Sequence, residues 1–507
     1  MVLTVIIIYL LAVLAVGSLS HRLFRGTGED YFVATRTIGP FILLMSLFGT
    51  HMTAFSLLGA SAESYHTGIG VFALMASSSA LVAPAVFFFI GTRAWAIGKQ
   101  HGYLTQVQFL RERWNSDAVA LIMFVALIGF LIPYLLIGVM GGGITLNEIT
   151  NGHVPEWVGG LMVCIVVLVY VTYGGLRGTA WANTFQTLVF MTLGAVTFFV
   201  IVNKLGGFSN AMSLVAEQHP ELLVRGDNIK PLKSLSYTLI PLSVGTFPHI
   251  FIHWLSAKRA DSFRYPMILY PLCVAVVWIP SVLLGVLGTN DFSNLQGPAA
   301  NSILIKMIGR YSPEVLSGFL AAGVFAAIMS SLDSQVLSIG TMFTQDIVRR
   351  YGFHDQMSER QQIFFGRIFV VAILAITFLL SQISNRSIFK LGTWSFTGFT
   401  ALFPIVVAAL YWKRSTKYGA LASAITVVVL WIAFFIQGWR DPNYTIGGSG
   451  LMPVAVMLAA STLAMVSGSL LTKAPDEAIL EKFFPSDGYV SVKQFGHRSE
   501  EASSRLN

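Results

Sequence analysis

Long apolar runs alternate with short polar segments along the whole chain. Runs near the roughly 20 residues that cross the hydrocarbon core of a bilayer predict transmembrane helices. In the first half they cover residues 2–20, 39–66, 69–92, 118–146, 155–173, 182–203 and 235–256. In the second half they cover 266–288, 313–344, 363–383, 388–411, 418–437 and 449–472. The pattern predicts an all-α polytopic membrane protein with about 13 transmembrane helices.

The composition agrees with this pattern. Only 11% of the residues are charged and 55% are hydrophobic, whereas about 25% of an ordinary soluble domain is charged. Cys164 and Cys273 each stand alone in an apolar run, which indicates neither a disulfide framework nor a metal motif. We expect one membrane domain surrounded by a lipid bilayer, no soluble catalytic domain, and a polar tail from about Lys473.

The basic residues indicate the orientation in the membrane. The first run has no basic leader and is followed at once by His21, Arg22 and Arg25, which is typical of an uncleaved anchor. With its start outside, the inner loops hold 18 Lys and Arg residues and the outer segments nine, as the positive-inside rule requires. We expect a multi-pass protein of the plasma (inner) membrane with its N-terminus outside and its C-terminus in the cytoplasm. The net charge of +8 is dispersed among these loops and indicates no nucleic-acid partner.

Small and polar residues interrupt two of the apolar runs. The first interruption is SLFGTHMTAFSLLGAS, from Ser46 to Ser61, and the second is LSVGTFPHIFIHW, from Leu242 to Trp254. In the second, Pro248 has no N–H to donate and its ring opposes a continuous helix. Backbone left unpaired at membrane depth is tolerated only around a buried cavity. We therefore expect two discontinuous helices that border a binding site.

The spacing of the two interruptions predicts the topology. Five spans separate their starting points, so the two broken helices enter the membrane in opposite directions. This is the arrangement of inverted five-helix repeats, in which broken helices build a site near the bilayer midplane. The expected division is an extra helix and inner loop at 1–38, an inverted-repeat transporter core of ten helices at 39–411, two peripheral helices at 412–473 and a cytoplasmic polar tail at 474–507.

Five ordered segments carry a resemblance to a known family. They are EDYFVATRTIG (29–39), YGGLRGTAWANTFQ (173–186), FPHIFIHWLSAK (247–258), AAIMSSLDS (326–334) and FPIVVAALYWKRSTKYGALAS (403–423). In this order the chain resembles the sodium:solute symporters, which include transporters for proline, pantothenate, sugars and monocarboxylates. The resemblance implies import of a small organic solute with Na+ as the coupling ion, by alternation of the core between outward-open and inward-open states.

The resemblance also implies a sodium site between the first broken helix, at 39–66, and the eighth helix of the core, at 313–344. By position, its ligands are the carbonyls of Gly49, Met52 and Ala327 and the hydroxyls of Ser330 and Ser331. Sodium is a hard cation that several neutral oxygens satisfy, and a helix break frees carbonyls for this purpose. Neutral ligands also allow the ion to be released.

Two polar residues beside this site are possible coupling residues. Asp333 is a carboxylate within a span, near the same helix face as Ser330; it could tune the ion site, bind a proton or pair with a buried basic group. Asn183 replaces an aspartate that lines an additional sodium site in some members of the family. The loss of this carboxylate favours one sodium ion per cycle, although the carboxylate of Asp333 could replace it in part.

His51 is a departure at the expected solute site, because the proline branch of the family carries an aspartate there. The imidazole could bind an anion if protonated, donate a hydrogen bond to a neutral solute, titrate as a coupling group, or simply be a buried neutral histidine. The expected lining residues come from both breaks and the third core helix: His51, Thr53, Phe55, Ser56, Tyr134, Leu242, Gly245, Thr246 and Phe247.

Two other functions compete with sodium-coupled symport. One is a proton-coupled symporter of the same fold that uses His51 or Asp333. The other is a membrane-embedded metalloenzyme with a metal held by His51, His249, His253 and Asp333. The sequence contains no HExxH, nucleophile elbow or phosphate loop, so an enzyme is not the expected function. The identity of the solute, the sodium stoichiometry and the oligomeric state stay open.

Overall fold

A computed structural model describes residues 1–20, 36–226, 229–352 and 357–484. Within these ranges the protein is helical and its only β-type pairing is an isolated bridge between Ile38 and Ala257. Nine described helices are long and apolar enough to span a membrane, two bent helix pairs pass the same test together, and two shorter apolar helices complete the set. The number of spans agrees with the prediction.

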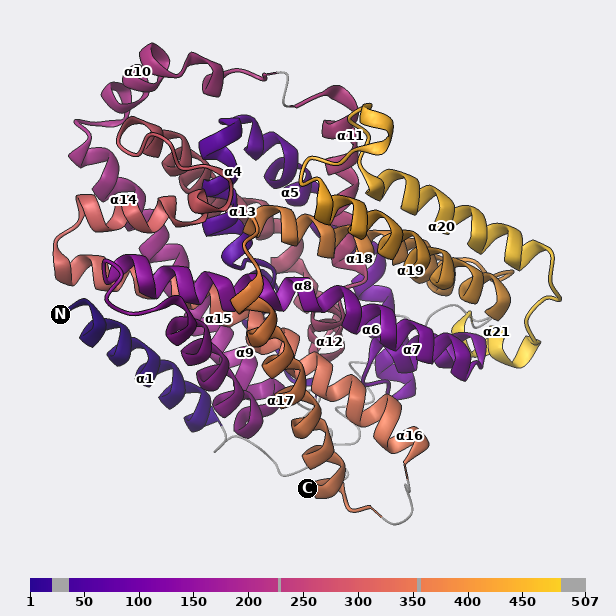
Figure 1. The fold of residues 1–507 in the computed structure, drawn as a ribbon. Coiled ribbons are helices and arrows are strands. Elements are labelled where there is room, and N and C mark those ends of the chain that lie inside the picture. The colour runs from indigo at the N-terminus through magenta and orange to yellow at the C-terminus, as the bar shows by residue number, and fades with distance from the viewer. Residues whose placement is uncertain (21–35, 227–228, 353–356, 485–507) are drawn as a thin grey trace.

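The helices follow the expected order (Figure 1). The first half contains α1 (Val2–Ser20), α3 (Pro40–His51), η3 (Phe55–Gly59), α4 (Ala60–Thr67), η4 (Phe72–Ala76), α5 (Ser77–Val86), η5 (Phe87–Gly91), α6 (Thr92–His101), α7 (Gln106–Trp114), α8 (Asp117–Ile149), α9 (Glu156–Lys204), α10 (Phe208–Gln218), η6 (Pro220–Leu223), α11 (Pro231–Leu239), η7 (Ile240–Gly245) and α12 (Pro248–Ser256). The second half contains η8 (Ala260–Phe263), α13 (Arg264–Leu287), η9 (Gly288–Asn290), η10 (Gly297–Ser302), α14 (Ile303–Tyr311), α15 (Glu314–Met342), η11 (Phe343–Val348), α16 (Arg349–Tyr351), α17 (Glu359–Ile383), α18 (Ile388–Tyr411), α19 (Lys417–Arg440), η13 (Ile446–Gly448), α20 (Pro453–Leu470) and α21 (Glu477–Phe483).

Both predicted helix breaks are present. The chain bends by 57° between α3 and the helix that starts at Phe55, and by 47° between η7 and α12. At the first break Met52 has extended backbone angles, and the Thr53 hydroxyl accepts a hydrogen bond from the backbone N–H of Phe55 at 2.9 Å, which caps the new helix. At the second, Pro248 occupies the first turn of α12, where no N–H is needed.

One connection between spans is very short. The spans predicted at 155–173 and 182–203 are both present, as Glu156–Thr172 and Gly175–Lys204, and together they make up α9. They are joined at Gly175, which has φ 53° and ψ −158°, a conformation open to glycine and strained for other residues. A sharp bend at Gly175 therefore connects the two predicted spans.

The additional helices lie at two edges of the core. Helix α1 runs along α9 and α15 at one edge (Figure 1). Helices α19 and α20 pack against each other and against α18 at another edge (Figure 1).

The segment before α3 is tied to the end of α12. Ile38 donates its N–H to the Ser256 carbonyl at 3.1 Å and accepts from Lys258 at 2.9 Å. Arg36 donates to the carbonyls of Leu255 and Tyr103. The start of one broken helix is thus joined to the end of the other. Most of the segment at 29–39, the basic residues Arg22 and Arg25, and the tail from 485 onward lie outside the described residues.

Candidate functional site

The break after α3 faces the middle of α15. The Ser330 hydroxyl donates to the Gly49 carbonyl at 2.9 Å and to the Ala327 carbonyl at 3.1 Å, and Ser330 is fully buried. Gly49 and Ser330 are 281 residues apart in the sequence. Folding therefore brings together three of the five oxygens that the family resemblance implies as sodium ligands.

Helix termination explains why these carbonyls are available. Because α3 ends at His51, the carbonyls of its last turn cannot all find N–H partners within the helix. The Gly49 carbonyl bonds to Ser330, and the His51 carbonyl accepts from the Tyr134 hydroxyl at 3.4 Å. Glycine is needed at 49 for a close approach, since a Cβ there would lie 2.1 Å from the Thr187 hydroxyl on α9.

The other two implied ligands lie beside this contact. Met52 ends α3 with extended backbone angles, φ −86° and ψ 116°, so its own peptide leaves the helical path. Ser331 is buried, and its hydroxyl donates at 3.0 Å to Ile328, one turn back on α15. The Ser331 hydroxyl would have to rotate about χ1 before it could bind an ion at the break after α3.

A buried polar cluster follows one turn further along α15. The Asp333 carboxylate accepts hydrogen bonds from the hydroxyls of Tyr170 at 2.8 Å and Ser334 at 3.1 Å. The Asn183 amide donates to the hydroxyls of Thr50 at 3.0 Å and Ser334 at 2.8 Å. Both predicted coupling residues therefore belong to one network. No ion pair within the described ranges includes Asp333, so the basic partner considered above is not found there.

The two histidines of α12 have different surroundings. His253 Nε2 lies 3.1 Å from the Ser334 hydroxyl and 3.4 Å from the Thr50 hydroxyl, which places it in the Asp333 cluster. His249 packs on the ring of Phe247, with centroids 4.9 Å apart. No three His, Cys, Asp or Glu side chains converge as metal ligands in the part of the chain that the structure describes.

A cavity lies at the two breaks, and Met52, whose carbonyl is one of the implied sodium ligands, is part of its lining. Its lining residues are His51, Met52, Phe55, Ser56, Met75, Ser79, Ile240, Pro241, Ser243, Trp278 and Phe396. Of the residues expected to line a solute site, His51, Phe55 and Ser56 do so.

The other six expected residues do not line this cavity: Thr53, Tyr134, Leu242, Gly245, Thr246 and Phe247. Several of them instead contact residues of neighbouring helices. Thr246 donates to the carbonyl of Phe399 at 2.7 Å, which fastens the second break to α18. The rings of Tyr134 and Phe247 stack with centroids 5.7 Å apart.

Sequence reasoning missed the lining residues on neighbouring helices. Met75 and Ser79 come from the second core span, Trp278 from α13 and Phe396 from α18. The only sequence signal was the run of three serines at 77–79 within an apolar span. The aromatic residues carry no such signal, because Phe and Trp are common in every span of this chain.

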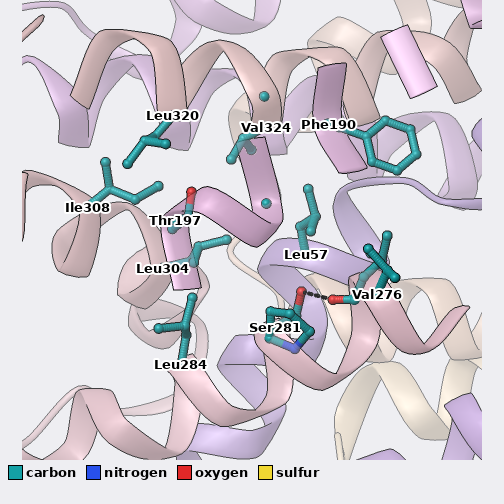
Figure 2. A pocket seen from close by; sticks show the side chains of 14 residues that line it. Leu57, Phe190, Thr197, Val276, Ser281, Leu284, Leu304, Ile308, Leu320 and Val324 are labelled. Atoms are coloured by element: carbon teal, nitrogen blue, oxygen red, sulfur yellow. Dashed lines mark hydrogen bonds between the residues drawn. The ribbon is translucent and has the colours of Figure 1, made fainter. Parts of the chain in front are cut away.

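A second cavity lies between α9, α13, α14 and α15 (Figure 2). Its lining is apolar apart from two hydroxyls, and both donate within their own helices: Ser281 to Val277 at 2.8 Å and Thr197 to Leu193 at 2.7 Å. It therefore offers no free hydrogen-bonding group to a polar solute.

The family model described as the sodium:solute symporter family matches residues 31–426. The chain belongs to this family. It is a membrane transporter and not an enzyme, and its coupling ion is sodium, so neither the metalloenzyme nor the proton-coupled alternative is supported.

Individual relatives agree with this assignment over nearly the full length. The high-affinity proline transporter PutP of Bacillus subtilis is 25% identical over 467 residues, which cover 90% of this chain and 95% of that protein. The sodium/pantothenate symporter of Escherichia coli is 24% identical over 489 residues, 94% and 98% of the two chains. The solved structure of a Na+-coupled sialic acid symporter has a TM-score of 0.77 at 17% identity and covers 94% and 98%. This likeness confirms the predicted all-α transporter fold with its inverted-repeat core.

Proposed function

We propose that this symporter binds its sodium ion between α3 and α15 and its solute in the adjacent cavity. The ion is held by the carbonyls of Gly49, Met52 and Ala327 and the hydroxyls of Ser330 and Ser331. The observation that carries the proposal is the Ser330 hydroxyl within 2.9 Å of the Gly49 carbonyl and 3.1 Å of the Ala327 carbonyl. An ion seated there joins the two helices, so its binding and release favour different conformations of the core.

The solute is a small organic molecule. Relatives of this chain are named as transporters of proline and pantothenate, which are small organic molecules. Solute entering beside His51 and Phe55 contacts the broken helix directly, because both residues belong to the segment around the first break. Occupancy of the cavity is thereby coupled to occupancy of the ion site.

One sodium ion per cycle suffices for uptake. Moving one positive charge inward yields about 2.3 kcal/mol per 100 mV, and a tenfold sodium gradient adds about 1.4 kcal/mol. Together these accumulate a neutral solute several hundredfold. When a monoanion is carried with one sodium ion, no net charge crosses the membrane. The membrane potential then contributes nothing, and only the chemical gradient of sodium drives uptake.

The proposed orientation has the N-terminus outside and the C-terminus in the cytoplasm, because basic residues predominate in the loops that this topology puts inside. The proposed division places the transporter core at 39–411, with 1–38, 412–473 and 474–507 as peripheral segments. The position of α1, α19 and α20 at the edges of the core supports it (Figure 1).

Sodium-dependent thermal stabilisation of purified protein tests the ion site. Ser330→Ala removes a ligand and is expected to raise the half-saturating sodium concentration about tenfold, the equivalent of about 1.4 kcal/mol. The matched control is Ser338→Ala, since Ser338 is buried on the same helix and its hydroxyl bonds only to Gln335, at 2.7 Å. Equal sodium dependence in Ser330→Ala and wild-type protein would contradict the site. Equal stabilisation by potassium would contradict sodium binding altogether.

A further inference from the structure

The solute cavity contains hydrogen-bond donors that have no partner among the described residues. Ser79 and Ser243 are 5% and 2% exposed and line the cavity, and neither hydroxyl makes a hydrogen bond within the described part of the chain. Trp278 also lines the cavity, but its indole nitrogen is fully buried, so the ring contributes apolar surface. Buried donors are normally satisfied, so a group without a partner at a cavity indicates an acceptor on the ligand.

His51 adds another donor because Tyr270 fixes its tautomer. His51 Nδ1 is hydrogen-bonded to the Tyr270 hydroxyl, and within the described ranges this hydroxyl makes no other hydrogen bond. A buried phenol must place its single proton on an acceptor, so Tyr270 donates and Nδ1 accepts. In the neutral ring the remaining proton is then on Nε2. This atom has no protein partner and is not among the fully buried polar atoms, so its N–H is available at the cavity.

The cavity offers no partner for an ammonium group. No Asp or Glu lines it, and the nearby buried carboxylate of Asp333 is engaged by Tyr170 and Ser334. The lining therefore provides no carboxylate that could pair with an ammonium group of the solute.

The rest of the lining is aromatic and aliphatic. Phe55 stacks on Phe389 with centroids 4.7 Å apart, and Trp278 and Phe396 approach it edge-on at 5.8 and 5.0 Å. Met75 and Ile240 complete the apolar wall. Such a surface gains from contact with a hydrocarbon or ring body rather than a polyhydroxylated one.

We propose that the solute is a monocarboxylate with an apolar body and no ammonium group, whose carboxylate accepts hydrogen bonds from His51 Nε2, Ser79 and Ser243. A carboxylate accepts up to about four such bonds. Tyr270 is the positioning residue, because it directs the N–H of His51 into the cavity. This inference rests on the proposed function, which puts the solute in this cavity.

Binding to purified protein in saturating sodium tests the proposal. Three carboxylates of increasing size are compared with the amino acids that differ from them only by an α-ammonium: propanoate with alanine, 4-methylpentanoate with leucine, and 3-phenylpropanoate with phenylalanine. At least one carboxylate is expected to stabilise the protein at a concentration tenfold or more below that of its amino acid. Equal or better binding of the amino acids, or no binding by any carboxylate, would overturn the proposal.

Variants separate this inference from the proposed function. Tyr270→Phe is expected to weaken carboxylate binding about fivefold or more, as for one lost hydrogen bond, with an unchanged half-saturating sodium concentration. His51→Asp should invert the preference and select the amino acid. Ser281→Ala, in the apolar cavity of Figure 2, is the control and should change neither. If carboxylate binding is unaffected in Tyr270→Phe, the proposed role of Tyr270 is refuted. If sodium does not stabilise the wild-type protein, the proposed function is refuted instead.

Discussion

At the scale of single residues, the network around Asp333 lies beside the proposed sodium site. Asp333 lies three residues after Ser330 on α15, and Ser334 and Thr50 connect it to Asn183 on α9. A buried carboxylate without a basic partner in the described ranges is costly unless it serves a function. We interpret it as a charge that attracts sodium to the neighbouring neutral oxygens.

Removing this charge tests the interpretation. Asp333→Asn keeps the shape of the side chain and is expected to weaken sodium binding by about 2 kcal/mol, or more than tenfold, for charges roughly 7 Å apart at an effective dielectric constant near 20. The half-saturating sodium concentration for thermal stabilisation measures this effect.

Moving the charge within the network provides the control. The double variant Asp333→Asn with Asn183→Asp returns a carboxylate to the same cluster and is expected to recover part of the sodium affinity. Unchanged sodium dependence in Asp333→Asn would show that the carboxylate serves only packing and hydrogen bonding.

At the scale of helices, breaks rather than continuous segments create the site. The bends of 57° and 47° release carbonyls and leave space between the half-helices. A third irregularity, at Gly175, is a sharp bend of the backbone that connects two spans. Its backbone angles are accessible to glycine and strained for residues with a Cβ.

Gly175→Ala is expected to destabilise the protein by about 1–3 kcal/mol, because alanine must adopt these angles. The matched control is Gly129→Ala within α8, where a Cβ would meet nothing within 4 Å and where alanine favours the helix by about 1 kcal/mol. Thermal unfolding of the two purified variants measures the difference. A Gly175→Ala protein as stable as Gly129→Ala would refute the strained turn.

At the scale of the whole molecule, the C-terminal helix α21 joins segments that are distant in the sequence. Phe483 is fully buried and packs against the rings of Tyr103 and Phe109 at 6.2 and 5.5 Å. Lys482 forms an ion pair with Glu112 at 2.7 Å. Helix α21 therefore fastens the connection between the second and third core spans, on the side that the proposed orientation puts in the cytoplasm.

Phe483→Ala is expected to cost about 3 kcal/mol through the loss of a buried ring, and to increase amide hydrogen exchange in the connection at residues 102–114. Lys482→Ala should cost less than about 1 kcal/mol, because the ion pair is about one-third exposed. Hydrogen exchange with mass spectrometry resolves the two effects. Similar exchange in Phe483→Ala and wild-type protein would show that α21 does not hold this connection.

Much of the architecture was predictable because the bilayer imposes strong local rules. A span must be about 20 residues long and apolar, and a Pro or Gly with polar neighbours interrupts it in a recognisable way. The number of spans and the positions of both breaks followed from these rules. The residues implied as sodium ligands needed the family resemblance in addition, since serines in a membrane helix also bond to their own backbone, as Ser331 does here.

The sequence by itself determined where the chain crosses the membrane, where two crossings break and which family it belongs to, because these depend on residues close together in the chain. Only the tertiary structure decided which side chains meet. It placed Ser330 against a carbonyl 281 residues away, brought His253 to the Asp333 cluster, and lined the solute cavity with Trp278 and Phe396. Contacts of this kind depend on how whole helices rotate and pack, and the apolar pattern of a single span does not contain that information, since almost every face of these helices is apolar.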